Sequence, residues 1–123
     1  MSSSGCVLGA DRIMLNMRRN QGGDKGLADG LEQAAAVVAE VAAAAACGAC
    51  VDRHTCDQLP VFMSLAQGPS RVRVQQPLSE HARSACAVAS QFTGAVFAVE
   101  EAEGGHGCII LSCTPPRKPA RGQ

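Results

Sequence analysis

The stretch from residue 27 to residue 47, LADGLEQAAAVVAEVAAAAAC, is the longest part of the chain with one regular pattern. Its apolar residues recur at spacings of four and three, which is helical periodicity; they are Leu27, Leu31, Ala34, Val38, Val41 and Ala45. Alanine loses no rotamer freedom in a helix, so the composition favours the same structure. Gly48 follows as a C-cap residue. We therefore predict a helix over 27–47.

The alanine-rich face of this helix allows a partner surface to approach closely, because methyl groups replace larger side chains along it. The partner is either the sheet of the same domain, which is the more common arrangement, or a helix of another subunit. Glu40 interrupts the apolar run, and the uncharged stretches on either side of it are too short to cross a bilayer. We therefore expect no membrane insertion.

The rest of the chain predicts one more long helix and several strands. The second helix covers 78–92, with Ser79 as its N-cap, Glu80 in its first turn and Gly94 at its end. A short buried strand is expected at 61–66, and RVRVQ at 71–75 alternates strictly, so these two strands should form a hairpin. Two further strands are expected at 95–99 and 108–112. Residues 47–60 are expected to form an irregular polar connection.

This order, (β)αββαββ, predicts the α+β class. We expect a two-layer sandwich in which two main helices lie on one face of an antiparallel sheet of 4–5 strands. The order fits a ferredoxin-like sandwich if Val7–Leu8 is a strand, and a roadblock/longin-like or profilin-like sandwich if it is not. The predicted domains are a loosely ordered lead-in at 1–26 with a short helix after Asp11, a single domain at 27–113 and a disordered basic tail at 114–123.

Composition restricts the possible functions. The 11 basic and 11 acidic residues cancel, so no overall field attracts nucleic acid or an anionic membrane. The chain has three Phe and no Trp or Tyr, which removes the stacking platforms of single-strand nucleic-acid binders. No secretory signal is evident at the N-terminus. The seven cysteines are therefore expected to be reduced thiols in an intracellular, cytoplasmic protein.

A cluster of soft ligands suggests a metal site. Four potential zinc ligands fall within ten residues: Cys47, Cys50, His54 and Cys56. Structural zinc sites usually take two ligand pairs from separated segments, so an incidental cluster in a loop is the more common explanation. Zinc is thus the one cofactor that the sequence suggests, and otherwise none is expected.

Other catalytic arrangements are incomplete. Cys47 and Cys50 form a Cys-x-x-Cys pair at a helix C-terminus, where the helix dipole opposes the thiolate that redox chemistry needs. Cys86 and His81 are five positions apart on a helix and therefore lie on different sides of it. No nucleophile, base and orienting group can be named together, and none of the common phosphate-binding or hydrolase motifs is present. The sequence therefore predicts a protein that is not an enzyme.

We interpret the chain as a non-catalytic interaction module, an adaptor or scaffold subunit that binds another protein or a second copy of itself. Arg71, Arg73 and Gln75, on one face of a predicted edge strand, are the expected partner-binding residues. Two alternatives remain open. One is a structural zinc protein that uses the 47–56 cluster, and the other is weak nucleic-acid binding through Arg71, Arg73 and the tail, which the absence of aromatic residues between the arginines disfavours.

Overall fold

The computed structural model describes residues 5–12, 24–104 and 106–116. Three helices, α1 (Asp24–Cys47), α2 (Arg53–Leu65) and α3 (Glu80–Thr93), accompany three strands, β1 (Ser70–Gln75), β2 (Val96–Glu101) and β3 (Cys108–Thr114). The strands form one antiparallel sheet in the order β1-β3-β2. The α+β class and the antiparallel sheet are confirmed, whereas the described part of the chain contains three strands and not the expected four or five.

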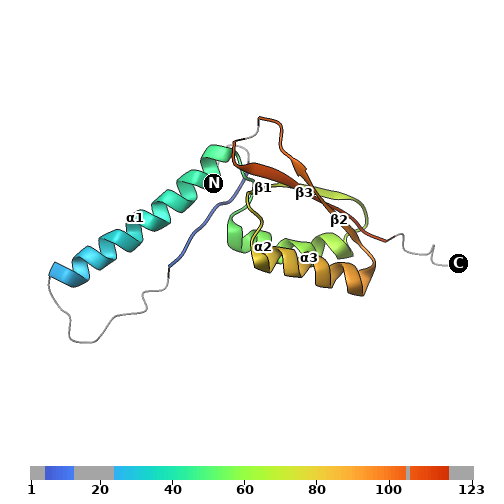
Figure 1. Cartoon of the computed structure of the whole chain (residues 1–123), viewed down its shortest axis with the longest axis horizontal. Coiled ribbons are helices and arrows are strands. Elements are labelled where there is room, and N and C mark those ends of the chain that lie inside the picture. Colours follow the sequence, from blue (N-terminus) through green and yellow to red (C-terminus); the bar gives the residue numbers. More distant parts are fainter. Residues whose placement is uncertain (1–4, 13–23, 105, 117–123) are drawn as a thin grey trace, which may run out of the picture.

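The layer that covers the sheet is made of α2 and α3, which lie side by side beneath it (Figure 1). Alternate residues of β1 and β3 point into this layer, and Val74 and Leu111 are 0% and 1% exposed. From the helices, Cys56 and Met63 of α2 and Ala82 of α3 complete the core. The chain thus buries one face of its sheet against two helices that are adjacent in space but separated by β1 in sequence.

The strand predicted at 61–66, and with it the hairpin to 71–75, is wrong. These residues belong to α2, in which Cys56, Pro60, Met63 and Ser64 are buried at helical spacing. Because proline has no backbone N–H, Pro60 suggests a helix boundary when only the sequence is considered. Its ring is fully buried in the core, and packing of this face keeps the helix continuous through it.

The helix predicted at 27–47 is present as α1, but it does not cover the sheet. It runs outward from one end of the molecule (Figure 1), and Leu27, Leu31 and Val38 are 66%, 63% and 67% exposed. Only its last turn joins a small second core, which contains Ala44, Cys47, Ala49, Ala102 and Cys108. The alternative of a helix contact between subunits stays a prediction.

Over Gly26–Cys47, α1 is long and apolar enough to cross a membrane by length and composition alone. One such helix is weak evidence for insertion, because helices of soluble proteins pass the same test. The expectation of no membrane insertion stays a prediction.

The second predicted helix is confirmed as α3. The Ser79 side chain accepts a hydrogen bond from the backbone N–H of Ala82, and Gly94 ends the helix at a φ of 76°. The short helix predicted after Asp11 and most of the predicted tail lie outside the described residues. Val7 forms an isolated parallel bridge with Val51, and no strand forms at Val7–Leu8 within the described range 5–12.

Candidate functional site

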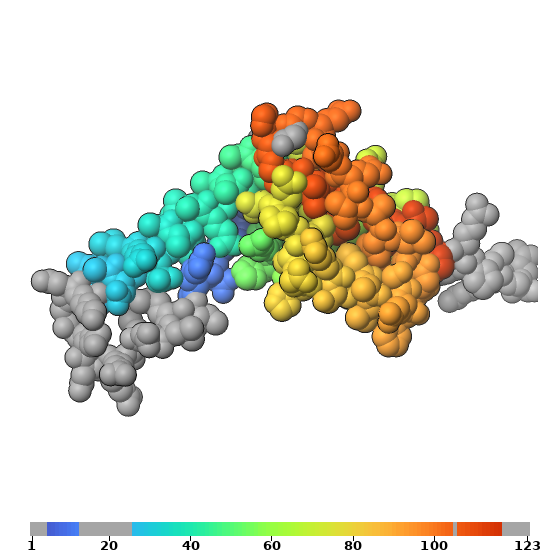
Figure 2. Space-filling view, viewed as in Figure 1, coloured from blue at the N-terminus to red at the C-terminus, as the bar shows by residue number. Residues whose placement is uncertain are grey.

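The candidate site lies where residues 5–12 meet the start of α2. The Val7–Val51 bridge aligns the two segments, and the backbone N–H of Gly9 donates to Asp52 Oδ2 over 3.1 Å. In Figure 2 residues 5–12 (blue) lie between α1 and α2. These contacts bring Asp11 and Arg12 to a helix terminus about 40 residues further along the chain.

Asp52 holds this junction together, because it is also the N-cap of α2. Its Oδ1 accepts from the backbone N–H of Thr55 over 2.8 Å, and its Oδ2 accepts from the Thr55 hydroxyl over 3.2 Å. Burial acts to raise the pKa of this carboxyl, but the hydrogen bonds from Thr55 and Gly9 together outweigh burial and lower the pKa. Asp52 is therefore an ionised acceptor shared by two segments.

The first turn of α2 presents His54 to Asp11. The Nε2 atom of His54 lies 3.2 Å from Oδ1 of Asp11, and the two side chains are 58% and 78% exposed. A neutral imidazole that directs its Nε2 proton toward the carboxylate keeps the Nδ1 lone pair free. An imidazole oriented in this way can accept a proton from a bound hydroxyl group.

A cleft of about 400 Å³ lies between α1, the start of α2 and the end of β1. It is lined by Arg12, Ala36, Ala39, Glu40, Arg53, Gln75 and Gln76. The small Ala36 and Ala39 leave room at the α1 wall, and Arg12 pairs with Glu40 at 3.6 Å. Arg53 is the first residue of α2, at the helix end where the dipole favours an anion. The cleft thus combines two cations, one carboxylate and two amides, and its Arg12 and Arg53 directly follow Asp11 and precede His54 in the sequence.

The four predicted zinc ligands are not assembled. Cys47 is joined to Cys108 by a disulfide, and among the described residues no group of three or more Cys, His, Asp or Glu side chains could hold a metal ion. Cys56 is buried in the core, where desolvation first, and then the neighbouring Asp57, raise its thiol pKa to about 11. The α2 helix separates these side chains because His54 and Cys56 occupy different sides of its first turns.

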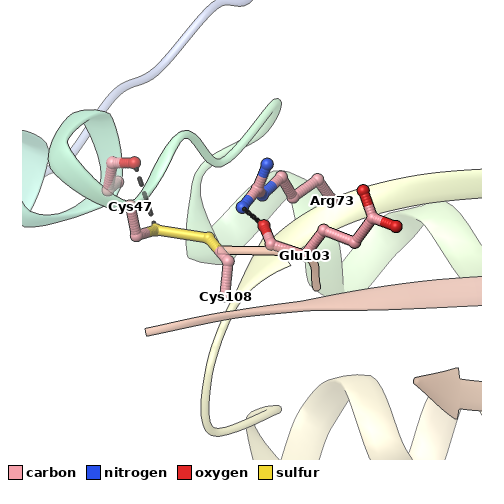
Figure 3. Close-up of a disulfide and its surroundings, with 5 residues drawn as sticks. Cys47, Arg73, Glu103 and Cys108 are labelled. Atoms are coloured by element: carbon pink, nitrogen blue, oxygen red, sulfur yellow. Dashed lines mark hydrogen bonds between the residues drawn. A yellow bond between two sulfur atoms is a disulfide. The ribbon is translucent and has the colours of Figure 1, made fainter. Parts of the chain in front are cut away.

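Two of the seven cysteines differ from the predicted reduced state. The Cys47–Cys108 disulfide spans 61 residues and links the end of α1 to the start of β3 (Figure 3). Cys50 remains a free thiol, and its pKa is raised by burial and by a hydrogen bond with Cys6. Cys47 and Cys50 therefore do not form the Cys-x-x-Cys disulfide that the spacing allows.

The predicted partner-binding residues fall into two places. Arg71 pairs with Glu100 at 2.8 Å, and Nη2 of Arg73 donates to the backbone carbonyl of Glu103 over 2.9 Å (Figure 3). Glu101 and Glu103 line the same pocket as both arginines on this side of the sheet. Gln75 instead lines the cleft beside α2. Binding of a partner through Arg71, Arg73 and Gln75 stays a prediction.

Comparison with known proteins identifies the family of this chain. The family model of RNA 3'-terminal phosphate cyclases matches residues 8–99, which is 92 of the 123 residues. The chain belongs to the RNA 3'-terminal phosphate cyclase family. The match includes the segment that carries Asp11 and Arg12, all of α2 and the cleft residues of β1.

Two curated relatives carry the same name. The chain is 42% identical over 64 residues to the RNA 3'-terminal phosphate cyclase of Drosophila melanogaster, a match that covers 52% of this chain and 17% of the relative. It is 31% identical over 70 residues to the "Probable RNA 3'-terminal phosphate cyclase" of Dictyostelium discoideum, covering 54% of this chain and 16% of the relative. The chain thus spans about a sixth of the length of these relatives. No solved structure matches it.

Family membership overturns the functional interpretation drawn from the sequence. A non-catalytic adaptor or scaffold subunit is wrong, because the family and both relatives are named for an enzymatic activity. The expectation that the chain is not an enzyme is wrong for the same reason. The sequence alone does not pair His54 with Asp11, because the two residues are 43 positions apart. The sequence feature that could have indicated this site is Asp52, a good N-cap residue that predicts a helix beginning with Arg53 and His54.

Proposed function

We propose that this chain supplies the part of an RNA 3'-terminal phosphate cyclase that binds the terminal phosphate and accepts a proton from the RNA end. The proposal is carried by the contact between His54 and Asp11, whose chain neighbours Arg53 and Arg12 line one cleft, within the segment that matches the cyclase family. The whole activity is named in relatives of which this chain matches only 17% and 16%, so the proposal concerns this chain's contribution to it.

The cleft suits a terminal phosphate better than an internal phosphodiester. A terminal phosphate carries up to two negative charges and can accept forked hydrogen bonds from Arg53 and Arg12. Arg12 is held by Glu40 at 3.6 Å, which leaves further N–H groups of its guanidinium available. Gln75 and Gln76 can donate to the remaining oxygens or contact the ribose.

His54 is placed to take the proton of a 2'-hydroxyl. Cyclisation of a monoprotonated terminal phosphate forms the bond from the 2'-oxygen to phosphorus and breaks one P–O bond, and the oxygen that leaves takes up the hydroxyl proton and departs as water. With Nε2 directed toward Asp11, the Nδ1 lone pair can accept that proton. We propose an intracellular chain, since its substrate class is RNA, and more specifically a cytoplasmic one.

A binding experiment tests the phosphate site. Fluorescence anisotropy would compare a labelled oligoribonucleotide ending in a 3'-phosphate with the same oligonucleotide ending in a 3'-hydroxyl. We expect the phosphate-ended RNA to bind about tenfold more tightly, because charge-assisted hydrogen bonds contribute about 1.5–3 kcal/mol each. Arg53→Ala should remove this difference, and Arg83→Ala, on α3, should keep it. Equal affinity for both RNA ends would refute the phosphate site.

A second experiment tests the proposed role of His54 as a general base. Formation of the cyclic phosphate end would be followed by mass spectrometry, and His54→Asn should lower the rate about 10²–10⁴-fold, the usual contribution of a general base. Asp11→Asn should lower it less, since the imidazole stays in place without its orienting charge. His106→Asn is the matched control. If His54→Asn retains the full rate, the assigned role of His54 is wrong.

A further inference from the structure

The Cys47–Cys108 disulfide joins the helix and the sheet on which two walls of the proposed phosphate cleft lie. Cys47 is the last residue of α1, and Ala36 and Ala39 of the same helix form one wall. Cys108 is the first residue of β3 and lies opposite Gln75, which belongs to the other wall. Figure 3 shows the bond between the end of the helix and the strand.

Little else within the described residues attaches α1 to the molecule. Its buried residues are Ala44 and Cys47, both near its C-terminal end, and only 6% of its apolar window is buried. The Arg12–Glu40 ion pair is one further link, and exposed ion pairs contribute little to stability. Directly after the helix, Gly48 adopts a φ of 74°, a conformation that glycine tolerates without strain. In the part of the chain that the structure describes, α1 is therefore attached mainly through its last turn and the disulfide.

We propose that Cys47–Cys108 is a redox modification site that controls the phosphate cleft. This inference rests on the proposed function of the cleft. In the oxidised protein the bond holds the Ala36–Ala39 wall close to Gln75 and Gln76. In the reduced protein α1 moves away from the sheet, and the cleft binds RNA 3'-phosphate ends less tightly.

The chemistry is an ordinary thiol–disulfide exchange with a dithiol reductant. The S–S bond breaks, and each sulfur gains one electron and one proton, while the two thiols of the reductant are oxidised to a disulfide. In the reduced form the Cys47 thiol can donate to the carbonyl oxygen of Ala44, which lies 3.3 Å from its Sγ. Both cysteines are less than 10% exposed, so the reductant reaches them when the last turn of α1 opens.

The test uses the full chain, oxidised or treated with dithiothreitol. Hydrogen exchange of the backbone amides of residues 36–46 reports on α1, with the amides of α3 as the internal reference. Anisotropy with the 3'-phosphate oligonucleotide reports on the cleft. We expect reduction to speed exchange in α1 and to weaken binding about tenfold, because apparent affinity falls with the fraction of molecules in the competent conformation.

Cysteine variants separate the effect of breaking the Cys47–Cys108 disulfide from other effects of the reductant. Cys108→Ser and Cys47→Ser should both behave like the reduced protein and respond no further to dithiothreitol, whereas Cys86→Ser should respond like the unmodified chain. Unchanged α1 exchange on reduction would overturn the inference. Faster exchange with unchanged affinity would overturn it and leave the proposed function standing. Absence of binding in both redox states would overturn the proposed function, and the inference with it.

Discussion

Asp52 shows how much of the site depends on one side chain. Its carboxylate caps α2 through Thr55 and fixes residues 5–12 through the backbone N–H of Gly9. The cap places His54 in the first turn of the helix, and the contact with Gly9 places Asp11 opposite it. A residue that touches neither of the proposed reacting groups thus determines whether they meet.

Removal of this carboxylate should destabilise the protein. Asp52→Ala loses the N-cap of α2, which costs about 1–2 kcal/mol of unfolding free energy, and it also leaves Gly9 without its acceptor. Urea denaturation followed by circular dichroism measures the effect. Glu32→Ala, on the exposed part of α1, is the control and should stay within about 0.5 kcal/mol of the unmodified chain. Equal midpoints for both variants would contradict the role given to Asp52.

The same residue predicts a dependence of stability on pH. The pKa of Asp52 is lower in the folded protein than its ordinary value of 3.8. The ionised group therefore stabilises the fold above that value, and this contribution is lost as the pH falls through the folded-state pKa. Between pH 6 and pH 3, the unmodified chain should lose stability more steeply than Asp52→Asn, which caps the helix without titrating. Parallel profiles in thermal denaturation would count against this explanation.

At the scale of elements, burial distinguishes the central strand from the longest helix. β3 pairs with both neighbours, and Leu111 is 1% exposed between the sheet and the helical layer. α1 has the more regular sequence pattern, but Leu31 is 63% exposed. Leu111 and Leu31 are therefore expected to contribute very different amounts to the free energy of unfolding.

Truncation of these two leucines should give clearly different results. Leu111→Ala removes a fully buried side chain from the core and should lower the free energy of unfolding by about 3 kcal/mol. Leu31→Ala should change it by less than about 0.5 kcal/mol, because the side chain already contacts solvent. Urea denaturation of both variants would check this difference. A large loss for Leu31→Ala would mean that its exposed face is covered by a second copy or another partner.

At the scale of the whole molecule, the disulfide is a long-range covalent constraint. It closes a loop between residues 61 positions apart and unites the small core at the end of α1 with the sheet. Such a loop lowers the entropy of the unfolded chain and contributes about 4 kcal/mol in the chain-entropy model.

Reduction should therefore lower the free energy of unfolding by up to about 4 kcal/mol. Urea denaturation with and without dithiothreitol measures this change, and Cys108→Ser should match the reduced protein in both conditions. An unchanged denaturation midpoint would show that the bond contributes nothing to global stability.

The sequence alone determined the elements whose signals are local. α1 and α3 follow from periodicity, the N-cap Ser79 and the glycines that end both helices, and β1 follows from the alternation of Arg71 to Gln75. These signals depend on residues within a few positions of one another. The antiparallel α+β class follows from their order along the chain.

Only the tertiary structure decided which faces meet. Burial of Pro60 and Met63 makes residues 61–65 helical although their composition suits a strand, and α2 then takes the place on the sheet that α1 was expected to fill. The pairs His54–Asp11 and Cys47–Cys108 join residues 43 and 61 positions apart. Such contacts depend on packing of the whole chain, which leaves no periodic signal in the sequence around either partner.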